Sequence, residues 1–144
     1  MFAYWFLLSL FGFAALNENY RMKIKTNFLN LGVSLYFWVF ILTLFVGFRD
    51  NVGTDWFPYL RLFNKLSEIS LFEIFSYKSY SENISYSVLM WLSSKLNLGI
   101  YGVNLFLGFI FSLSLVIFCN HFPRPYLGLL VSFPFIVKVV GMGY

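Results

Sequence analysis

The densest group of polar residues lies in the string FRDNVGTDWFPY, from Phe48 to Tyr59. Arg49 directly follows a long uncharged run, so its guanidinium is expected at the depth of lipid phosphates. A guanidinium there can bind a phosphate or pyrophosphate through paired donors. Asp55 could orient Arg49 by pairing with it, or accept a proton in a partly desolvated site. The residues alone leave a plainer interpretation open, in which Arg49 reaches the interface while Asp50 and Asp55 cap the next helix.

Three other residues are candidates for the same site. Glu82 precedes a predicted helix, where its charge would also stabilise the helix N-terminus. Tyr59 suits an aromatic anchor at the membrane interface as well as a substrate contact. Lys138 lies inside the last apolar run, where a lysine is costly unless it faces a cavity, reaches the interface or pairs. Ordinary helix packing through the small residues at 141–143 remains an equal alternative for this segment.

The composition requires a membrane to surround these residues. Hydrophobic residues make up 60% of the 144 and charged residues 11%, whereas soluble domains carry about a quarter charged. A soluble fold of this size would expose much of its aromatic surface and aggregate. The net charge of +4 comes from short clusters, which disfavours nucleic-acid binding. With a single cysteine, Cys119, and a single histidine, His121, we expect no internal disulfide, metal site or cofactor.

Four apolar runs predict transmembrane helices within a single membrane domain, at about 1–16, 28–48, 99–119 and 126–144. The first run has no positive residue ahead of it, which favours a membrane helix over a signal peptide. Short loops rich in Lys and Arg stay in the cytoplasm. These are the loop with Arg21, Lys23 and Lys25 and the loop with Arg124. The N-terminus and the charge-balanced segment 49–98 are therefore predicted to lie outside.

The outer segment mixes aromatic and charged residues, which is typical of amphipathic helices lying in the interface. Two such helices are predicted between residues 56 and 77. Another is predicted from about residue 82 to 96, with Ile84, Val88 and Lys95 on one face. The sequence therefore predicts an all-α, polytopic membrane protein with about four transmembrane helices and added interfacial helices.

Together these residues resemble the N-terminal part of the EpsG family, the polysaccharide polymerases similar to bacterial O-antigen polymerases. The most specific element is Arg49 followed by Val-Gly-Thr-Asp at 52–55 and by Tyr59. Further along come Glu82, with Tyr86 just inside the helix, and a helix ending in Gly-Met-Gly-Tyr. One departure is an asparagine after Glu82, where the family often has proline.

The resemblance implies glycosyl transfer at the outer face of the bacterial cytoplasmic membrane. Such enzymes join oligosaccharide repeat units carried on polyprenyl pyrophosphate and use no nucleotide sugar. By this resemblance, Arg49 would hold the pyrophosphate, and Asp55 would orient Arg49 or accept the proton of the acceptor hydroxyl. Glu82 would be a second catalytic carboxylate. Expected partners are the lipid-linked oligosaccharide, membrane lipids and other membrane proteins of polysaccharide assembly.

The resemblance extends over nearly the whole chain, but family members carry many more membrane helices. In them the glycine-rich string runs into an Arg-Gln pair, which would follow Tyr144. We therefore expect a fragment, a truncated reading frame or one piece of a split protein, inactive alone. Two alternatives stay open: a small non-catalytic membrane protein that binds polyprenyl lipids or partner subunits, and a transporter fragment with Lys138 as its pathway charge.

Overall fold

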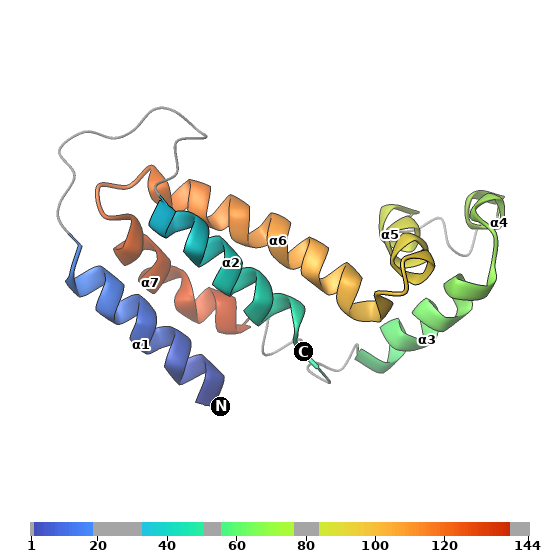
Figure 1. The fold of residues 1–144 in the computed structure, drawn as a ribbon, viewed down its shortest axis with the longest axis horizontal. Coiled ribbons are helices and arrows are strands. Elements are labelled where there is room, and N and C mark those ends of the chain that lie inside the picture. Colours follow the sequence, from blue (N-terminus) through green and yellow to red (C-terminus); the bar gives the residue numbers. More distant parts are fainter. Residues whose placement is uncertain (1, 19–32, 51–55, 77–83, 139–144) are drawn as a thin grey trace.

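A computed structural model describes residues 2–18, 33–50, 56–76 and 84–138 (Figure 1). In these ranges the chain forms seven α-helices and no strand, which confirms the predicted all-α class. The helices are α1 (Phe2–Leu16), α2 (Val33–Gly47), α3 (Trp56–Glu68), α4 (Leu71–Ser76), α5 (Ile84–Lys95), α6 (Gly99–Asn120) and α7 (Pro125–Ile136).

The apolar helices α1, α2, α6 and α7 expose large side chains as well as burying them. On α2, Leu35 and Leu42 are fully buried, whereas Phe40 is 61% exposed. On α1, Phe11 is buried and Trp5 is 68% exposed. A helix that is apolar on all sides belongs in a protein core or in lipid. Because these helices face outward with aromatic side chains, lipid is the environment that fits them.

Among the described helices, α6 alone is long and apolar enough to cross a membrane, while α1, α2 and α7 are apolar but shorter. The bounds of α6 agree with those of the helix predicted at 99–119 to within one residue. The run predicted to begin at residue 28 is helical from Val33, and residues 28–32 lie outside the described ranges. Helix α7 continues past Pro134 to Ile136, and residues 139–144 also lie outside them.

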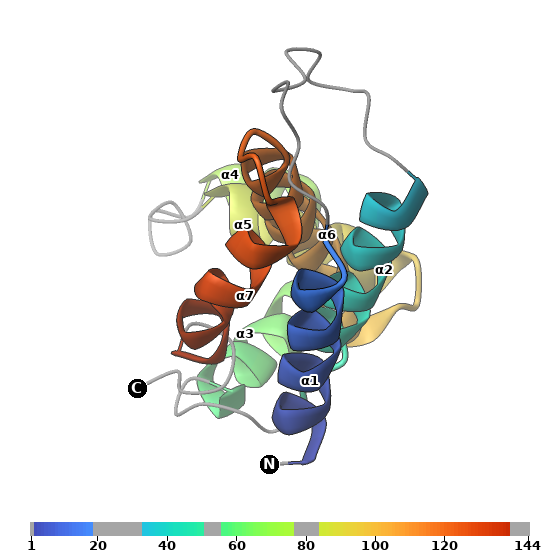
Figure 2. The ribbon, with the colours of Figure 1, turned by 90° about the vertical axis from the view of Figure 1, so that its left-hand side faces the viewer.

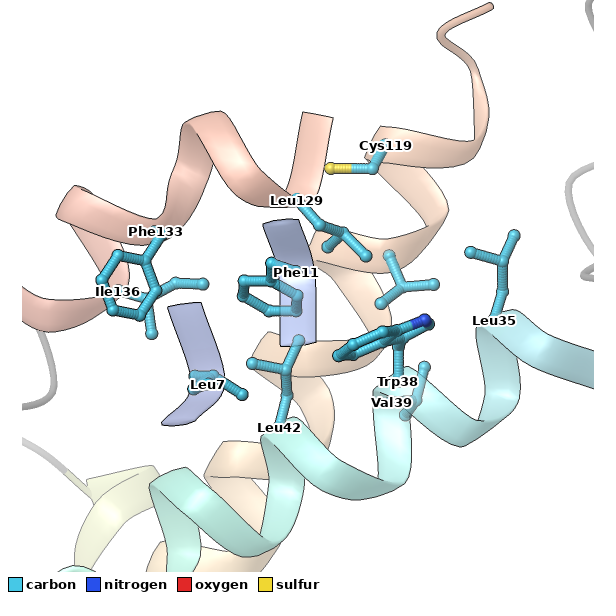
Figure 3. Close-up of a cluster of buried hydrophobic side chains, with 11 residues drawn as sticks. Leu7, Phe11, Leu35, Trp38, Val39, Leu42, Cys119, Leu129, Phe133 and Ile136 are labelled. Carbon is cyan, nitrogen blue, oxygen red and sulfur yellow. The ribbon is translucent and has the colours of Figure 1, made fainter. Parts of the chain in front are cut away.

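A core forms among α1, α2, α6 and α7, which group together in Figure 2. The Phe11 ring of α1 contacts Trp38 of α2 at 4.9 Å and Phe133 of α7 at 6.3 Å between ring centroids. Figure 3 shows these side chains converging from their helices. Aromatic contacts of this kind add specific geometry to the apolar burial.

Polar contacts join the ends of α1, α2 and α7. The Glu18 carboxylate, just after α1, accepts hydrogen bonds from the backbone N–H groups of Tyr126 and Leu127 at 3.1–3.2 Å. It thereby satisfies free donors in the first turn of α7. The Ser34 and Tyr126 hydroxyls also form a hydrogen bond. The C-terminal end of α1 and the N-terminal end of α7 therefore meet at one end of the helix group.

At the other end, α5 packs on α6, and α3 and α4 pack on α5. One fully buried residue from each of α3, α4 and α5 meets Val103 of α6 in a second apolar cluster. The Trp91 indole N–H donates to the Ile69 carbonyl at 3.1 Å. The predicted stripe on α5, which includes Ile84 and Lys95, is not its buried face. Instead α5 buries Ser87, Met90 and Ser93, because these residues face α3 and α6.

Candidate functional site

Arg49 is placed by the close approach of α2 to α6. Helix α2 ends at Gly47, and a Cβ there would lie 2.9 Å from the Leu105 Cα of α6. Glycine is therefore required for this contact, as is common where membrane helices pack closely. Arg49 follows two residues later and is half-buried. Its position thus depends directly on how closely α2 packs against α6.

Arg49 lines a cavity of about 500 Å³ at the junction of α2, α3, α5 and α6. This volume lies within the usual range for ligand sites, roughly 300–1,000 Å³. The other lining residues are Val46 of α2, Tyr59 and Leu62 of α3, Tyr86 and Ser87 of α5, and Asn104, Leu107, Gly108 and Phe111 of α6. The cavity is therefore lined by one cation, four neutral polar side chains and an apolar wall.

Two of the lining residues carry buried donors without an acceptor among the described residues. They are the Arg49 Nε and the Asn104 Nδ2, and the Asn104 residue is only 6% exposed. A buried donor left without a partner costs about 1–3 kcal/mol, and a charged group costs more. The cavity is therefore suited to a ligand that presents several acceptor oxygens.

The two tyrosines form one polar wall. The rings of Tyr59 and Tyr86 meet edge-to-face, with centroids 5.3 Å apart. Burial, reinforced by the neighbouring Tyr59, raises the pKa of Tyr86 above its ordinary value, although Arg49 opposes the shift. The Tyr86 hydroxyl is therefore neutral at physiological pH. It can donate a hydrogen bond to an anionic ligand.

Among the described residues, no carboxylate lines the cavity. The nearest acidic residue in sequence, Asp50, accepts a hydrogen bond from the Tyr101 hydroxyl outside it. The charge that the described lining contributes is thus that of Arg49. A positive charge without a negative one in this lining favours the binding of an anion.

Comparison with known proteins places the chain in a family. The family model described as the EpsG family matches residues 32–144. The chain belongs to the EpsG family. The matched range contains every residue that lines the cavity but not α1, so it is shorter than the resemblance predicted from the sequence. No curated protein and no solved structure shows a significant match. Membership of the EpsG family makes this chain a polysaccharide-polymerase-like membrane protein.

The EpsG-family structure brings two of the predicted site residues together, Arg49 and Tyr59. Asp55 and Glu82 lie outside the described residues, immediately before α3 and two residues before α5 in the sequence. Lys138 is exposed just beyond α7 and is not among the residues that line the cavity. The roles of Asp55, Glu82 and Lys138 remain predictions.

Sequence reasoning overlooked Asn104 and Ser87 as site residues. Both are small polar residues, and Asn104 interrupts the uncharged run at 99–119. Burial of a polar side chain inside a membrane helix costs free energy, so such a residue by default suggests a functional site. That signal was available for Asn104. Ser87 offered none, because serine is common in the surrounding segment.

Proposed function

We propose that this EpsG-family chain provides the donor site of a polysaccharide polymerase. The enzyme would join oligosaccharide repeat units linked to polyprenyl pyrophosphate, at the outer face of the bacterial cytoplasmic membrane. The observation that carries this proposal is the cavity that combines Arg49 with an apolar wall in the membrane helices. Family membership supports polysaccharide assembly as its setting.

The polarity of the cavity changes along α6. Gly47 packs on Leu105, so Arg49 lies toward the start of this helix near Asn104, whereas Leu107 and Phe111 continue the wall toward its middle. Seven residues of helix advance roughly 10 Å. A ligand that fits would have an anionic head at the end near Asn104 and an apolar part deeper in the membrane. A lipid-linked pyrophosphate has this chemistry.

In the proposed reaction, a hydroxyl of the acceptor sugar attacks the anomeric carbon of the donor. The bond between that carbon and the pyrophosphate oxygen breaks, and polyprenyl pyrophosphate leaves with the bonding electrons. Arg49 stabilises the negative charge that develops on the leaving group. Asp55 accepts the proton of the attacking hydroxyl or orients Arg49, and Glu82 is the second candidate for the proton.

We also propose that α1, α2, α6 and α7 each cross the membrane. Glu18 binds the first turn of α7, so the end of α1 and the start of α7 meet, which supports a shared cytoplasmic side for the basic loops that adjoin them in sequence. The cavity lies at the opposite end of α2 and α6, beside the outer helices. This arrangement would present Arg49 to substrates outside the cytoplasm.

The test is substitution of Arg49 in the chromosomal gene, with polymer length read from gels of cell-surface polysaccharide. Arg49→Ala should abolish the polymer, because a lost charge-stabilising donor typically slows a reaction about 10²–10³-fold. Cells with Arg49→Lys should make little polymer, since an ammonium lacks the paired donors of a guanidinium. Arg61→Ala is the matched control, because Arg61 is exposed on α3 and does not line the cavity.

Normal polymer in Arg49→Ala cells, at normal protein level, would refute the proposed role of Arg49 in polymerisation. If the same variant had also lost binding of a lipid pyrophosphate, a non-catalytic lipid-binding protein would become the better interpretation. Loss of polymer in Arg61→Ala cells would show that the assay responds to surface charge and not to the cavity.

A further inference from the structure

Asn104 differs from Thr43 and Ser114, two other polar residues of the membrane helices, in its hydrogen bonding. Thr43 and Ser114 donate their hydroxyls to the carbonyls one turn earlier, those of Val39 and Ile110, at 2.7 and 2.8 Å. Polar side chains in helices commonly satisfy themselves in this way. The Asn104 Nδ2 has no such acceptor among the described residues, although it is buried and Asn104 is one of the residues that line the cavity.

We infer that Asn104 is a ligand-binding residue whose side-chain amide donates to a phosphate oxygen of the molecule that Arg49 binds. The inference rests on the proposed function, because it takes the anionic lipid head as the ligand. An amide is a suitable second donor, since burying a second cation beside Arg49 would cost far more. Arg49 would carry the charge, and Asn104 would fix the orientation of the phosphate from α6.

A purely structural role for Asn104 makes the opposite prediction for stability. If its amide held the helices together, Asn104→Leu would remove a hydrogen bond and lower the melting temperature. The described structure contains no such bond to lose, and the leucine side chain has the same branching and number of heavy atoms as that of asparagine. Replacing an unsatisfied polar group by an apolar one of similar shape is neutral or stabilising. Asn104→Leu should therefore melt at or above the temperature of the wild type.

The experiment measures binding of farnesyl pyrophosphate to the purified protein in detergent, by titration of its tryptophan fluorescence. Asn104→Leu should weaken binding roughly tenfold or more, which is the value of one hydrogen bond to a charged group. Asn104→Asp should abolish binding, because its carboxylate repels the phosphate and neutralises Arg49. Ser112→Ala is the matched control, since Ser112 is also buried on α6 with an unsatisfied hydroxyl but does not line the cavity.

Inorganic pyrophosphate, farnesol and phosphatidylglycerol in mixed micelles distinguish the possible sources of the phosphate. Stronger binding of farnesyl pyrophosphate than of the other three supports a lipid-linked pyrophosphate. Equal binding of phosphatidylglycerol would contradict the polymerase donor site. Wild-type affinity in Asn104→Leu, combined with lost binding in Arg49→Ala, would overturn the role of Asn104 and leave the proposed function intact. Failure of the wild type to bind any probe would refute both.

Discussion

Substitution of Gly47 tests whether the close approach of α2 to α6 positions Arg49. In Gly47→Ala the new Cβ would lie 2.5 Å from the Leu105 Cδ2 and 2.9 Å from the Leu105 Cα. Carbon atoms in contact lie roughly 3.5–4.0 Å apart. The leucine side chain can rotate away but the Cα cannot, so the two helices must separate by at least about half an ångström. Overpacking of this kind costs about 1–3 kcal/mol.

Alanine also favours helix by about 1 kcal/mol over glycine, so the net destabilisation of Gly47→Ala should be up to about 2 kcal/mol. Gly12→Ala on α1 is the matched control, because no atom lies within 4 Å of its added Cβ. Gly12→Ala should leave the free energy of unfolding unchanged or raise it. Free energies of unfolding come from detergent titration of the purified proteins. Polymer length should fall with Gly47→Ala only, since misplacement of a catalytic group by about 1 Å can slow reaction 10²-fold. Equal stability of the two variants would refute the close helix contact.

Other predictions follow from single contacts. Glu18→Ala should lower the free energy of unfolding by about 1 kcal/mol, because the first turn of α7 loses its acceptor; an unchanged value in the same titration would exclude that role. Burial raises the pKa of Tyr86 above 10.0, so the stability it contributes is complete below pH 10 and is lost as the pH rises through the folded-state value. Tyr86→Phe should therefore flatten the alkaline decline of the unfolding free energy, and a parallel decline would contradict the assignment. In a Cys119→Ser background, a cysteine at Arg124 should react with a membrane-impermeant maleimide only after cell lysis, and one at Arg61 in intact cells. The reverse pattern would invert the proposed orientation.

Helices could be predicted from this sequence because their boundaries coincide with changes in polarity. The run expected at 99–119 is α6, and the helix expected from about 82 to 96 is α5, which begins at Ile84. The buried face of α5 could not be predicted, because Ser87 and Ser93 are buried with Met90 while Ile84 of the apolar stripe is exposed. In a membrane protein the apolar side of a helix need not be the packed side, since lipid also accepts apolar groups.

The cavity could be predicted only where its residues are close in sequence. Arg49 and Tyr59 share one polar string, so their common site was visible without a structure. Asn104 enters from α6, more than fifty residues from Arg49, through the packing of α2 on α6. Both helices are apolar on nearly all sides, so periodicity does not indicate which face of one meets the other. The glycines at the contact become informative once the helices are paired.

Helix α6 joins two apolar clusters that have different neighbours. Toward its C-terminus, Val116 belongs to the core of α1, α2 and α7, whereas near its start Val103 packs with α3, α4 and α5. The cavity lies between these clusters, so α2 and α6 supply its apolar wall while α3 and α5 supply the tyrosines. A displacement of the outer helices would therefore alter the polar end of the cavity and leave the apolar wall in place. The α2–α6 contact at Gly47, which positions Arg49, would also remain.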